Sequence, residues 1–426
     1  MADTAASTLT ADERSWLEAQ TSSLVDFARA SAHPDGGFAW LDDDGQPRLD
    51  QPVELWLTCR MTHVFALAAI QGDASATALV DHGVQALLGR LHDDEHGGWF
   101  AAVDSAGGAS SRPSDDTKQS YAHAFVVLAA ASATASGHPQ ARALLDDALD
   151  VFGRRFWSEA DGLVADVWDR SFTTLDPYRG VNANMHTVEA LLAARDVTGD
   201  RVLLTRATSI VTRVVHEFAA ANGYRLPEHY DEQWQVRLDH NRDHPADQFR
   251  PYGVTIGHLL EWARLALHVR TALGVDAPDW LLRDARNLFE TAVRDGWDVD
   301  GAEGFVYTTD FDGHPVVRDR LHWVVTEAIA TAWTLALVTG EGGYRGWYDR
   351  WIAHAAALFV DTGRGSWRHE LDPQNRPASS VWAGKPDVYH AYQAMLLPRL
   401  GEVTSFVAGV VAGVVSGVVS DRPAPT

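Results

Sequence analysis

A turn that recurs at a nearly constant interval places the strongest constraint on the fold of this chain. Each copy holds a glycine flanked by Asp, Asn or Glu and followed by a large apolar residue, a pattern typical of a tight turn or short hairpin. Successive markers are about 61, 64, 61, 81 and 61 residues apart, and the long gap contains the polar insertion Glu228 to Gln248. A repeat of this length indicates an array of two-helix units. The markers are Gly37, Gly98, Gly162, Gly223, Gly304 and Gly365.

Two apolar segments with helical periodicity lie between successive markers. A lone helix is expected before the first marker, Ala11 to Ala30, and another after the last, Asp387 to Leu400. These two helices would pair and close a ring. The other expected pairs are Pro52 to Ile70 with Ala74 to Leu91, Asp116 to Ala135 with Pro139 to Phe156, Asn182 to Ala194 with Arg201 to Ala220, Thr255 to Leu273 with Pro278 to Val293, and Asp319 to Val338 with Tyr344 to Phe359.

Helices paired in this way predict an all-α fold, an (α/α)6 barrel (a toroid of six helical hairpins) with short hairpin loops at one face. An open helical solenoid is the alternative, but the chain lacks the polar capping repeats that such an array needs. We expect residues 1–400 to form a single catalytic barrel domain and residues 401–426 to form a C-terminal tail. The tail contains a Val/Ala/Gly run, Phe406 to Val419, that is too short to span a bilayer and is either packed or disordered.

The helix that follows each marker carries a His, Arg or Tyr near its start although it is otherwise apolar. A single histidine on an apolar helix is usually a hydrogen-bonded core residue, but six equivalent positions indicate a shared pocket, because buried polar groups need partners. If these helices form the inner ring, their N-terminal ends meet at one mouth of the barrel. The groups are Trp56, Cys59, Arg60 and His63; Tyr121 and His123; Asn182, His186 and Glu189; His258 and Glu261; His322 and Glu327; and Tyr389, His390 and Gln393.

The residue types of this predicted pocket suit a sugar. Trp40, Trp56, Trp99, Trp382 and Tyr121 offer flat apolar faces for the C–H surfaces of a pyranose. The Arg, Asn, Gln and His side chains donate hydrogen bonds to hydroxyl groups. Most of the 16 Trp residues are expected to pack in the core instead.

Neither a metal nor a cofactor is expected. His258 and Glu261 have the reverse order of a Glu-x-x-His metal motif, and no His-x-x-x-His motif accompanies them. Zinc held by several histidines stays open as an alternative. The sequence has no glycine-rich phosphate loop or dinucleotide fingerprint, and the single cysteine, Cys59, excludes an internal disulfide and cysteine-rich metal sites.

Charge and composition limit the partners. The net charge of −23, with no basic cluster, argues against nucleic acid and against an anionic membrane surface. The polar N-terminal segment lacks the apolar region of a signal peptide, so a cytoplasmic location is expected. The outer helices show no apolar seam, and both a monomer and a homodimer remain open.

Four ordered motifs resemble the N-acylglucosamine 2-epimerase superfamily, and the resemblance extends to about Leu400. It implies an (α/α)6 barrel and a sugar 2-epimerase or aldose–ketose isomerase that uses neither metal nor redox cofactor. The motifs are Cys59-Arg60-Met61-Thr62-His63, Asn182-Ala183-Asn184-Met185-His186-Thr187-Val188-Glu189, Gly257-His258-Leu259-Leu260-Glu261-Trp262 and Tyr389-His390-Ala391-Tyr392.

Two further features are most similar to the D-mannose isomerase branch, which includes the sulfoquinovose isomerases. One is Pro52-Val53-Glu54-Leu55-Trp56 before the first motif. The other is Leu321-His322-Trp323, which places His322 where the epimerases tend to have Trp. Gln248 stands near the position where the sulfosugar enzymes are expected to have an extra Arg, although Arg250 follows closely. The resemblance therefore favours a neutral hexose.

The expected reaction is interconversion of D-mannose and D-fructose, with D-lyxose and D-xylulose as further substrates, through an enediol(ate). A histidine suits this chemistry because its pKa lies near neutrality. We expect His258 and His390 to be the acid–base pair, with Glu261 orienting His258; which histidine removes the C2 proton is left open. The expected substrate-binding residues are Arg60 and His186, which stabilise the enediolate oxygen, and Tyr121, Asn182, His322, Trp56 and Trp382.

Three other functions remain open at this point. A sugar 2-epimerase shares the enediolate but returns the proton to C2. A glycoside hydrolase needs a carboxylate pair, for which Asp115, Asp116 and Glu327 are the candidates, but it has no evident use for the histidines. The third is a non-catalytic sugar-binding or protein-interaction module.

Overall fold

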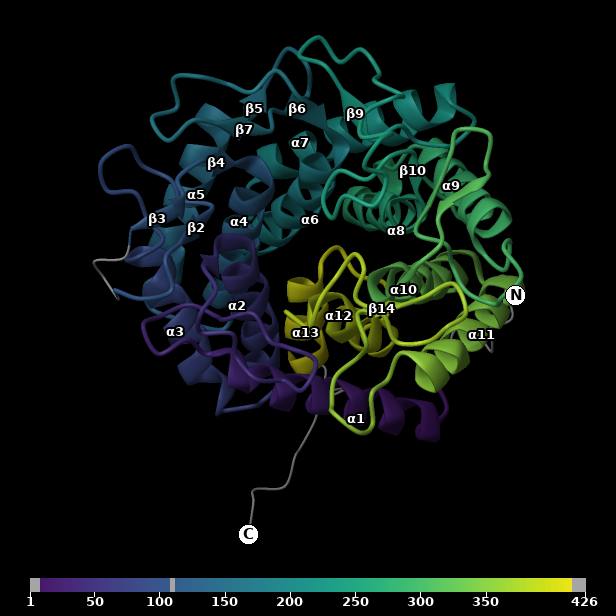
Figure 1. Ribbon diagram of the computed structural model, residues 1–426, viewed down its shortest axis with the longest axis horizontal. Coiled ribbons are helices and arrows are strands. Elements are labelled where there is room, and N and C mark those ends of the chain that lie inside the picture. The colour runs from purple at the N-terminus through teal and green to yellow at the C-terminus, as the bar shows by residue number, and fades with distance from the viewer. Residues whose placement is uncertain (1–7, 108–111, 416–426) are drawn as a thin grey trace.

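The computed structural model describes residues 8–107 and 112–415. Within these ranges the helices form two concentric rings (Figure 1). Neighbouring helices of the inner ring pack against one another, and α12 contacts α2 to close it. The inner helices are α2 (Leu55–Ile70), α4 (Ser120–Ala135), α6 (Val181–Thr198), α8 (Ile256–Leu273), α10 (His322–Thr339) and α12 (Tyr389–Leu396).

Each outer helix packs against an inner helix that is its neighbour in sequence, except that the N-terminal α1 packs against α12. This arrangement confirms the predicted (α/α)6 barrel, including its closure by the first and last helices. The outer helices are α1 (Ala11–Ala28), α3 (Ala76–Leu88), α5 (Ala141–Arg155), α7 (Arg201–Val211), which a π-helix (Thr212–Ala219) continues, α9 (Trp280–Gly296) and α11 (Gly342–Leu358); 3-10 turns span Arg29–Ser31, Gly274–Asp276 and Leu397–Arg399.

The two rings differ in the pattern of their apolar residues. In α10 every residue from His322 to Ala336 is buried, so this inner helix is surrounded on all sides. The outer helix α9 buries one stripe, which includes Leu281, Ala285 and Leu288, and exposes its polar face. A helix that is apolar all round is stable in water only when others cover it, and the amphipathic outer ring supplies that cover.

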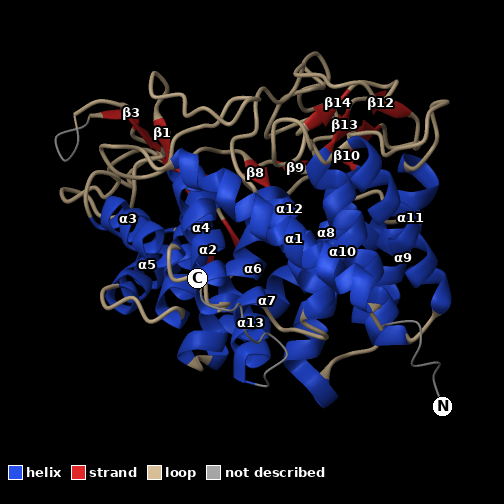
Figure 2. Ribbon diagram, turned by 90° about the horizontal axis from the view of Figure 1, so that it is seen from below, coloured by secondary structure: helices blue, strands red, loops and turns tan. Residues whose placement is uncertain are grey.

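Short antiparallel strands join the helices at one end of the barrel, where Figure 2 shows them gathered above the helices. Most are two residues long and pair segments that are distant in sequence; for example, Val53 lies opposite Val103. The sheets are β1 (Val53–Glu54), β2 (Ala102–Val103) and β3 (Pro113–Asp115); β10 (Val254–Thr255), β11 (Thr308–Thr309) and β12 (Pro315–Val317); β4 (Lys118–Gln119) with β7 (Val167–Trp168); β5 (Trp157–Ser158) with β6 (Leu163–Val164); β8 (Arg179–Gly180) with β9 (His229–Tyr230); and β13 (Arg320–Leu321) with β14 (Glu370–Leu371).

The recurring turns lie in this strand layer. All six marker glycines have a positive φ, between 60° and 146°, which explains why glycine recurs at them. At Gly98 a Cβ atom would also lie only 2.8 Å from His123 Nε2. The turns therefore bring the chain back from each outer helix to the start of the next inner helix.

The C-terminal segment predicted to be a tail is helical as far as the structure describes it. Helix α13 (Phe406–Val415) packs against α2, α4 and α6. Residues 416–426, the remainder of the predicted tail, lie outside the described residues. No helix within the described ranges combines the length and the apolar character that crossing a membrane requires.

Candidate active site

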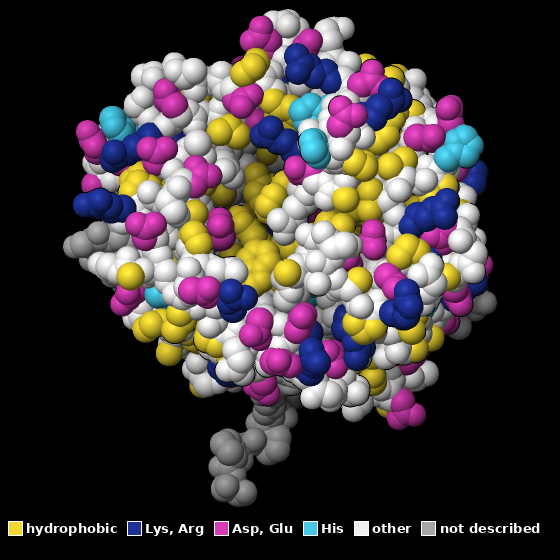
Figure 3. Space-filling view, viewed as in Figure 1, with side chains coloured by type: hydrophobic (Ala, Val, Ile, Leu, Met, Phe, Trp, Pro, Cys, Tyr) yellow, Lys and Arg dark blue, Asp and Glu magenta, His cyan; other side chains and the backbone are white. Residues whose placement is uncertain are grey.

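The N-terminal ends of the inner helices surround a pocket that opens through the strand layer, and Figure 3 shows the hollow at the centre of that face. Its volume is about 570 Å³, including the space at its mouth, which is enough for a monosaccharide. All six inner helices contribute, as their spacing predicted. The lining residues are Arg60, Tyr121, Asn182, His186, Gln248, Phe249, Pro251, His258, Glu261, Tyr307, His322, Trp323, His369, Trp382, Asp387 and His390.

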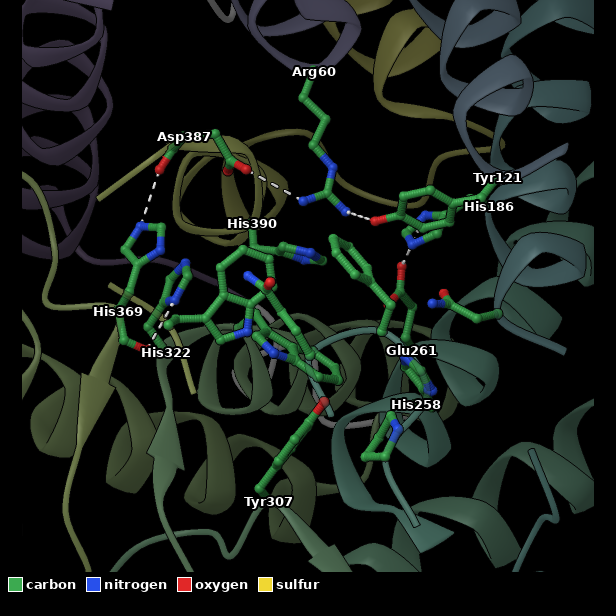
Figure 4. Close-up of a pocket in the computed structure, with 16 residues that line it drawn as sticks. Arg60, Tyr121, His186, His258, Glu261, Tyr307, His322, His369, Asp387 and His390 are labelled. Carbon is green, nitrogen blue, oxygen red and sulfur yellow. Dashed lines mark hydrogen bonds and ion pairs between the residues drawn. The ribbon is translucent and has the colours of Figure 1, made fainter. Parts of the chain in front are cut away.

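His390, on the first turn of α12, lines the pocket (Figure 4) and contacts a buried carboxylate that lies outside the pocket lining. Its Nδ1 lies 3.0 Å from Glu327 Oε1, and Arg264 Nε donates to Glu327 Oε2 at 2.9 Å. Burial, together with the nearby Arg60 charge, holds the pKa of His390 well below its usual value, so the imidazole is neutral at pH 7. Because the Glu327 carboxylate accepts from Nδ1–H, the lone pair of the neutral ring is on Nε2.

His258, on the first turn of α8, contacts a carboxylate from a different part of the chain. Its Nδ1 lies 3.0 Å from Glu228 Oε2, and Glu228 directly precedes β9, where the long insertion begins. The rings of His258 and His390 both pack against Trp323, with centroids 5.1 and 5.9 Å away. The two predicted acid–base residues therefore adjoin the same indole, each with its own carboxylate.

Glu261 does not orient His258, contrary to the expectation from their spacing. Three residues of helix separate the two along the axis by about 4.5 Å, so Glu261 lies deeper in the barrel than His258. There its Oε1 is 3.4 Å from Arg264 Nη2 and 3.9 Å from His186 Nδ1. Burial, and then the charge of Glu327, raises the pKa of Glu261 well above its ordinary value. Glu261 therefore belongs to a buried cluster around Arg264 and not to a pair with His258.

Arg60 reaches the pocket from α2 within a box of aromatic rings. Its Nη2 donates to the Tyr121 hydroxyl at 2.9 Å, and its Nη1 lies 3.2 Å from Asp387 Oδ2. Its Cζ lies 4.5 Å from the Phe125 ring centroid and 5.1 Å from that of Trp56. A guanidinium held from two sides in this way is a fixed positive charge beside the pocket.

His186 and His322 complete the polar wall as neutral groups. Burial lowers the pKa of His186 to about 4 and holds that of His322 well below its usual value. The His322 ring stacks on His369, with centroids 3.8 Å apart. Several buried polar atoms at the pocket lack a hydrogen-bond partner in the protein, as expected of a site that binds a polar ligand. They are Arg60 Nε, Asn182 Oδ1, His186 Nδ1, His258 Nδ1, Glu261 Oε2, His322 Nε2 and Trp382 Nε1.

The aromatic residues are arranged differently from the expectation. Trp382 lines the pocket, but Trp56 lies behind it, where it packs edge-on against Trp382 and Phe249. Trp40 stacks on Trp382 at 5.9 Å, and Trp99 is fully buried against His123. A sugar entering the pocket would therefore meet Trp382 and Trp323 rather than Trp56.

Several of the polar groups predicted on the inner helices do not line the pocket, among them His63, His123, Glu189, Glu327, Tyr389 and Gln393. His123 accepts from the Trp99 backbone N–H, at 3.1 Å. His63 and Gln393 lie deeper, where Gln393 Nε2 donates to Glu189 Oε1 at 2.8 Å. His123 lies in the first turn of α4 but packs against Trp99 and Phe156, whereas Arg60 and His186 line the pocket from the second turn of their helices. The face of the helix, as well as the position along it, therefore decides which groups reach the site.

The residues that sequence reasoning missed come mostly from the strand layer. Tyr307 and His369 directly precede two-residue strands, Asp387 lies two residues before α12, and no periodic pattern marks any of the three. Arg264 is different, because it lies three residues after Glu261 on α8, a spacing that places two side chains on one helical face. Among the missed residues, Arg264 is the one that could have been predicted from helical spacing.

Two groups of the pocket floor bring three potential metal ligands together, and Glu261 belongs to both. One is His186, Glu189 and Glu261, and the other is Glu261, Glu327 and His390. The Arg264 guanidinium contacts both Glu261 and Glu327, so it already supplies the positive charge that these carboxylates require. The donor set therefore fits an arginine-centred ion cluster better than a metal site.

The hydrolase candidates do not form a catalytic pair. Asp115 belongs to β3, outside the pocket, where its Oδ1 accepts from the Thr117 backbone N–H at 3.0 Å. Glu327 is engaged by Arg264 and His390. The pocket thus presents histidines, not a pair of carboxyl groups facing each other across a glycosidic bond.

Comparisons with known proteins agree with this arrangement. Residues 36–394 match the family model described as N-acylglucosamine 2-epimerase (GlcNAc 2-epimerase). A D-mannose isomerase of Thermobifida fusca is 55% identical over 394 residues, 92% of this chain and 96% of that protein. Another, of Pseudomonas cannabina pv. alisalensis, is 50% identical over 388 residues, 90% and 92% of the two chains.

A solved structure described as a D-mannose isomerase superposes with a TM-score of 0.84 at 30% sequence identity. The superposition covers 92% of this chain and 99% of that one. The family model spans every inner helix up to the second turn of α12, and the similarity to the two curated proteins extends over almost the full length of each. The chain belongs to the N-acylglucosamine 2-epimerase family.

Proposed function

We propose that this protein is an aldose–ketose isomerase that interconverts D-mannose and D-fructose without a cofactor. The observation that carries the proposal is the pair of histidines against Trp323, His258 with Glu228 and His390 with Glu327, in a pocket of monosaccharide size. The two curated relatives named D-mannose isomerase, at 55% and 50% identity, support this choice of substrate.

The reaction needs a base that removes the C2 proton of the open-chain aldose and returns a proton to C1. We assign this role to His390, because its neutral ring presents a free Nε2 while Glu327 holds Nδ1–H. As the proton leaves, the C2–H electrons form the C1–C2 double bond and the C1 carbonyl oxygen becomes an enediolate oxygen. His390 then delivers the proton to C1, and the carbonyl is left at C2.

His258 and Arg60 act on the oxygen atoms in this mechanism. His258, oriented by Glu228, opens the pyranose ring and moves the hydroxyl proton between O2 and O1. The Arg60 guanidinium, fixed by Asp387 and Tyr121, stabilises the enediolate oxygen. His186, Asn182 and His322 bind the remaining hydroxyls, and Trp382 offers its ring to the C–H face of the sugar.

The second candidate is a sugar 2-epimerase, because a base on each side of the sugar would allow the C2 proton to return from the opposite face. The pocket holds two such histidines. The sequence matches favour the isomerase, since the curated relatives carry that name. Activity on D-lyxose and D-xylulose stays part of the proposal, as does a monomeric or homodimeric state.

Product identification separates these functions. The purified protein is incubated with mannose, glucose, lyxose, N-acetylmannosamine and cellobiose, each with and without EDTA. We expect fructose from mannose and xylulose from lyxose, at the same rate with EDTA. The His390→Asn variant is expected to lose the activity and keep its melting temperature. Glucose from mannose without fructose would contradict the isomerase, and inhibition by EDTA would contradict the metal-free mechanism.

A further inference from the structure

Helix α13 lies at the end of the barrel opposite the pocket and its strand layer (Figure 2). It packs against the inner helices α2, α4 and α6, and Figure 1 shows it within the ring rather than on its outer wall. The family match ends at residue 394, before this helix begins. The proposed mechanism gives α13 no role, although it covers the lower end of the barrel.

The docking of α13 depends on specific side chains. Thr404 Oγ1 and Ser405 Oγ both donate to Asp196 Oδ2, at 2.6 and 2.7 Å. Gly409 faces the chain that precedes the helix, and a Cβ there would lie 2.6 Å from Val403 Cγ1. The helix also has two distinct faces: Phe406 is 3% exposed, whereas Val411 is 38% exposed. The Val/Ala/Gly composition therefore suits a short helix that must approach its neighbours closely.

The buried face of α13 forms the floor of a small cavity inside the inner ring. His63, Glu189 and His268 line this cavity from α2, α6 and α8, and residues 404–407 close it from below. The Phe406 ring centroid lies 5.7 Å from Arg264 Cζ and 6.2 Å from the His268 ring. His268 Nε2 is buried there without a hydrogen-bond partner. Phe406 is thus an apolar lid directly beneath charged and titratable groups.

Arg264 connects this floor to the catalytic pocket. Its guanidinium donates to Glu327, which contacts His390 Nδ1, so one chain of contacts leads from Phe406 to the proposed base. The interaction between a guanidinium and a carboxylate is stronger in a dry environment than in water. Without Phe406, water would reach Arg264 from below and weaken its hold on Glu327.

We propose that α13 is an intramolecular plug, in which Phe406 excludes water from the barrel floor and so holds Arg264, Glu327 and His390 in their catalytic arrangement. Phe406 is then a positioning residue, because it acts through Arg264 and touches no reacting atom. This inference rests on the proposed role of His390. The inference adds that the activity of His390 requires helix α13, which lies outside residues 36–394, the region that matches the family model.

The electrostatic effect of opening the floor has a definite sign. Burial is the main cause that holds the pKa of His390 below its usual value, so hydration of the network raises that pKa. A base with a raised pKa becomes protonated at higher pH, and activity is lost first on the acid side. The charged and titratable groups around the plug and His390 are His63, Glu189, Asp196, Glu261, Arg264, His268 and Glu327 below, and Arg60, His186, His322, His369 and Asp387 above.

The test compares Phe406→Ser with the matched control Val411→Ser, which changes the exposed face of the same helix. A double variant, Thr404→Val with Ser405→Ala, removes both bonds to Asp196 and leaves Phe406 intact. Diethyl pyrocarbonate modifies accessible imidazoles, and peptide mass spectrometry reads its rate at His268 and His63. The pH profile of kcat for mannose isomerisation is measured on the same preparations.

In Phe406→Ser and in the double variant we expect modification of His268 and His63 to speed up by about tenfold or more. We expect kcat at pH 6 to fall about tenfold, KM to change less than about twofold, and the acid limb to move to higher pH. Val411→Ser should match the unsubstituted protein in every measurement. The acid-limb shift identifies a positioning role when circular dichroism shows that the variant stays folded over the same pH range, because the stability of the fold itself decreases in acid.

Two outcomes would overturn the plug. One is continued protection of His268 in both variants, and the other is accelerated modification with an unchanged pH profile. The modification experiment does not depend on enzymatic activity. If the unsubstituted protein fails to isomerise mannose, the proposed function fails, while the accessibility of His268 still decides whether α13 seals the floor.

Discussion

At the scale of single residues, the site is defined by which carboxylate each histidine contacts. The spacing of His258 and Glu261 predicts that they form a pair, yet Glu228 from the loop contacts His258 and Glu261 belongs to the Arg264 cluster. Helical spacing alone cannot decide between them, because Glu228 is 30 positions away and reaches the pocket through the pairing of β8 with β9. The residue types of the site were predictable, whereas their partners required the fold.

Glu228→Gln tests this assignment. Glu228→Gln removes the negative charge that lies 3.0 Å from His258 Nδ1, so kcat for mannose is expected to fall about 10- to 100-fold with KM nearly unchanged. Glu232→Gln, four residues later on the exposed part of the same loop, is the matched control and should retain full activity. Steady-state kinetics on both variants decide the matter. Equal activity of Glu228→Gln and the control would show that His258 works without this partner.

At the scale of elements, the sequence predicts the helices well and the strands poorly. Periodicity places the inner helix at Thr255 to Leu273, and the structure has it at Ile256–Leu273, because the apolar residues carry its whole length. The two-residue strands have no alternating pattern and form only because the barrel brings distant loop segments together. The pocket residues Tyr307 and His369 belong to that layer, so they were missed with it.

Asp166 joins two inner helices through the strand layer and makes their junction sensitive to pH. Its backbone carbonyl accepts from Ser120 N–H at the start of α4, and its Oδ2 accepts from Gly180 N–H before α6, each at 2.7 Å. Burial raises the pKa of Asp166 to about 7, against the opposing effect of the Gly180 hydrogen bond. A carboxyl whose pKa is raised on folding binds more protons in the folded state, so its contribution to stability declines as the pH rises from about 4 to 7.

Asp166→Asn removes this titration. The unsubstituted protein loses the contribution of protonated Asp166 as the pH is raised from 5 to 8, whereas the variant does not. We therefore expect the melting temperature of the variant minus that of the unsubstituted protein to be higher at pH 8 than at pH 5. Asp161→Asn, on an exposed turn nearby, should show a constant difference. Thermal melts at both pH values provide the comparison. A difference for Asp166→Asn that does not vary with pH would contradict a raised pKa in the folded state.

At the scale of the whole molecule, the closed ring follows from the number of helices that the repeats predict from the sequence. Each pair of helices shares one repeat, and the first and last helices have no partner except each other, as the packing of α1 on α12 confirms. The sequence could not establish whether the C-terminal segment packs against the barrel. Its low complexity leaves packing and disorder equally open, and the pairing of Thr404 and Ser405 with Asp196 arises only in the folded barrel.

The closed barrel also buries many histidines, and this predicts acid sensitivity. Burial lowers the pKa to about 4 or about 3 at positions throughout the barrel, including His63, His123, His268 and His369. Below pH 6.5 the unfolded chain binds protons that the folded protein does not, so the free energy of unfolding decreases as the pH is lowered. Each such histidine costs roughly 1–2 kcal/mol between pH 6.5 and 5.

The melting temperature is therefore expected to drop between pH 7 and pH 5. Buried carboxyls with raised pKa values, such as Asp166, oppose this trend but are outnumbered among the described residues by the histidines. His123→Gln, which lies outside the pocket, should reduce the drop. Differential scanning calorimetry over this range measures it, and a melting temperature that is equal or higher at pH 5 would contradict the account.

The central claim is that the pocket moves one proton between C2 and C1 of mannose through an enediolate. Incubating mannose with the protein in deuterated water, and analysing the products by NMR, tests it most directly. The account predicts fructose, with deuterium at C1 to the extent that the proton held by His390 exchanges with the solvent before it is returned, and no reaction in His390→Asn. Glucose labelled at C2, formed without fructose, would contradict it.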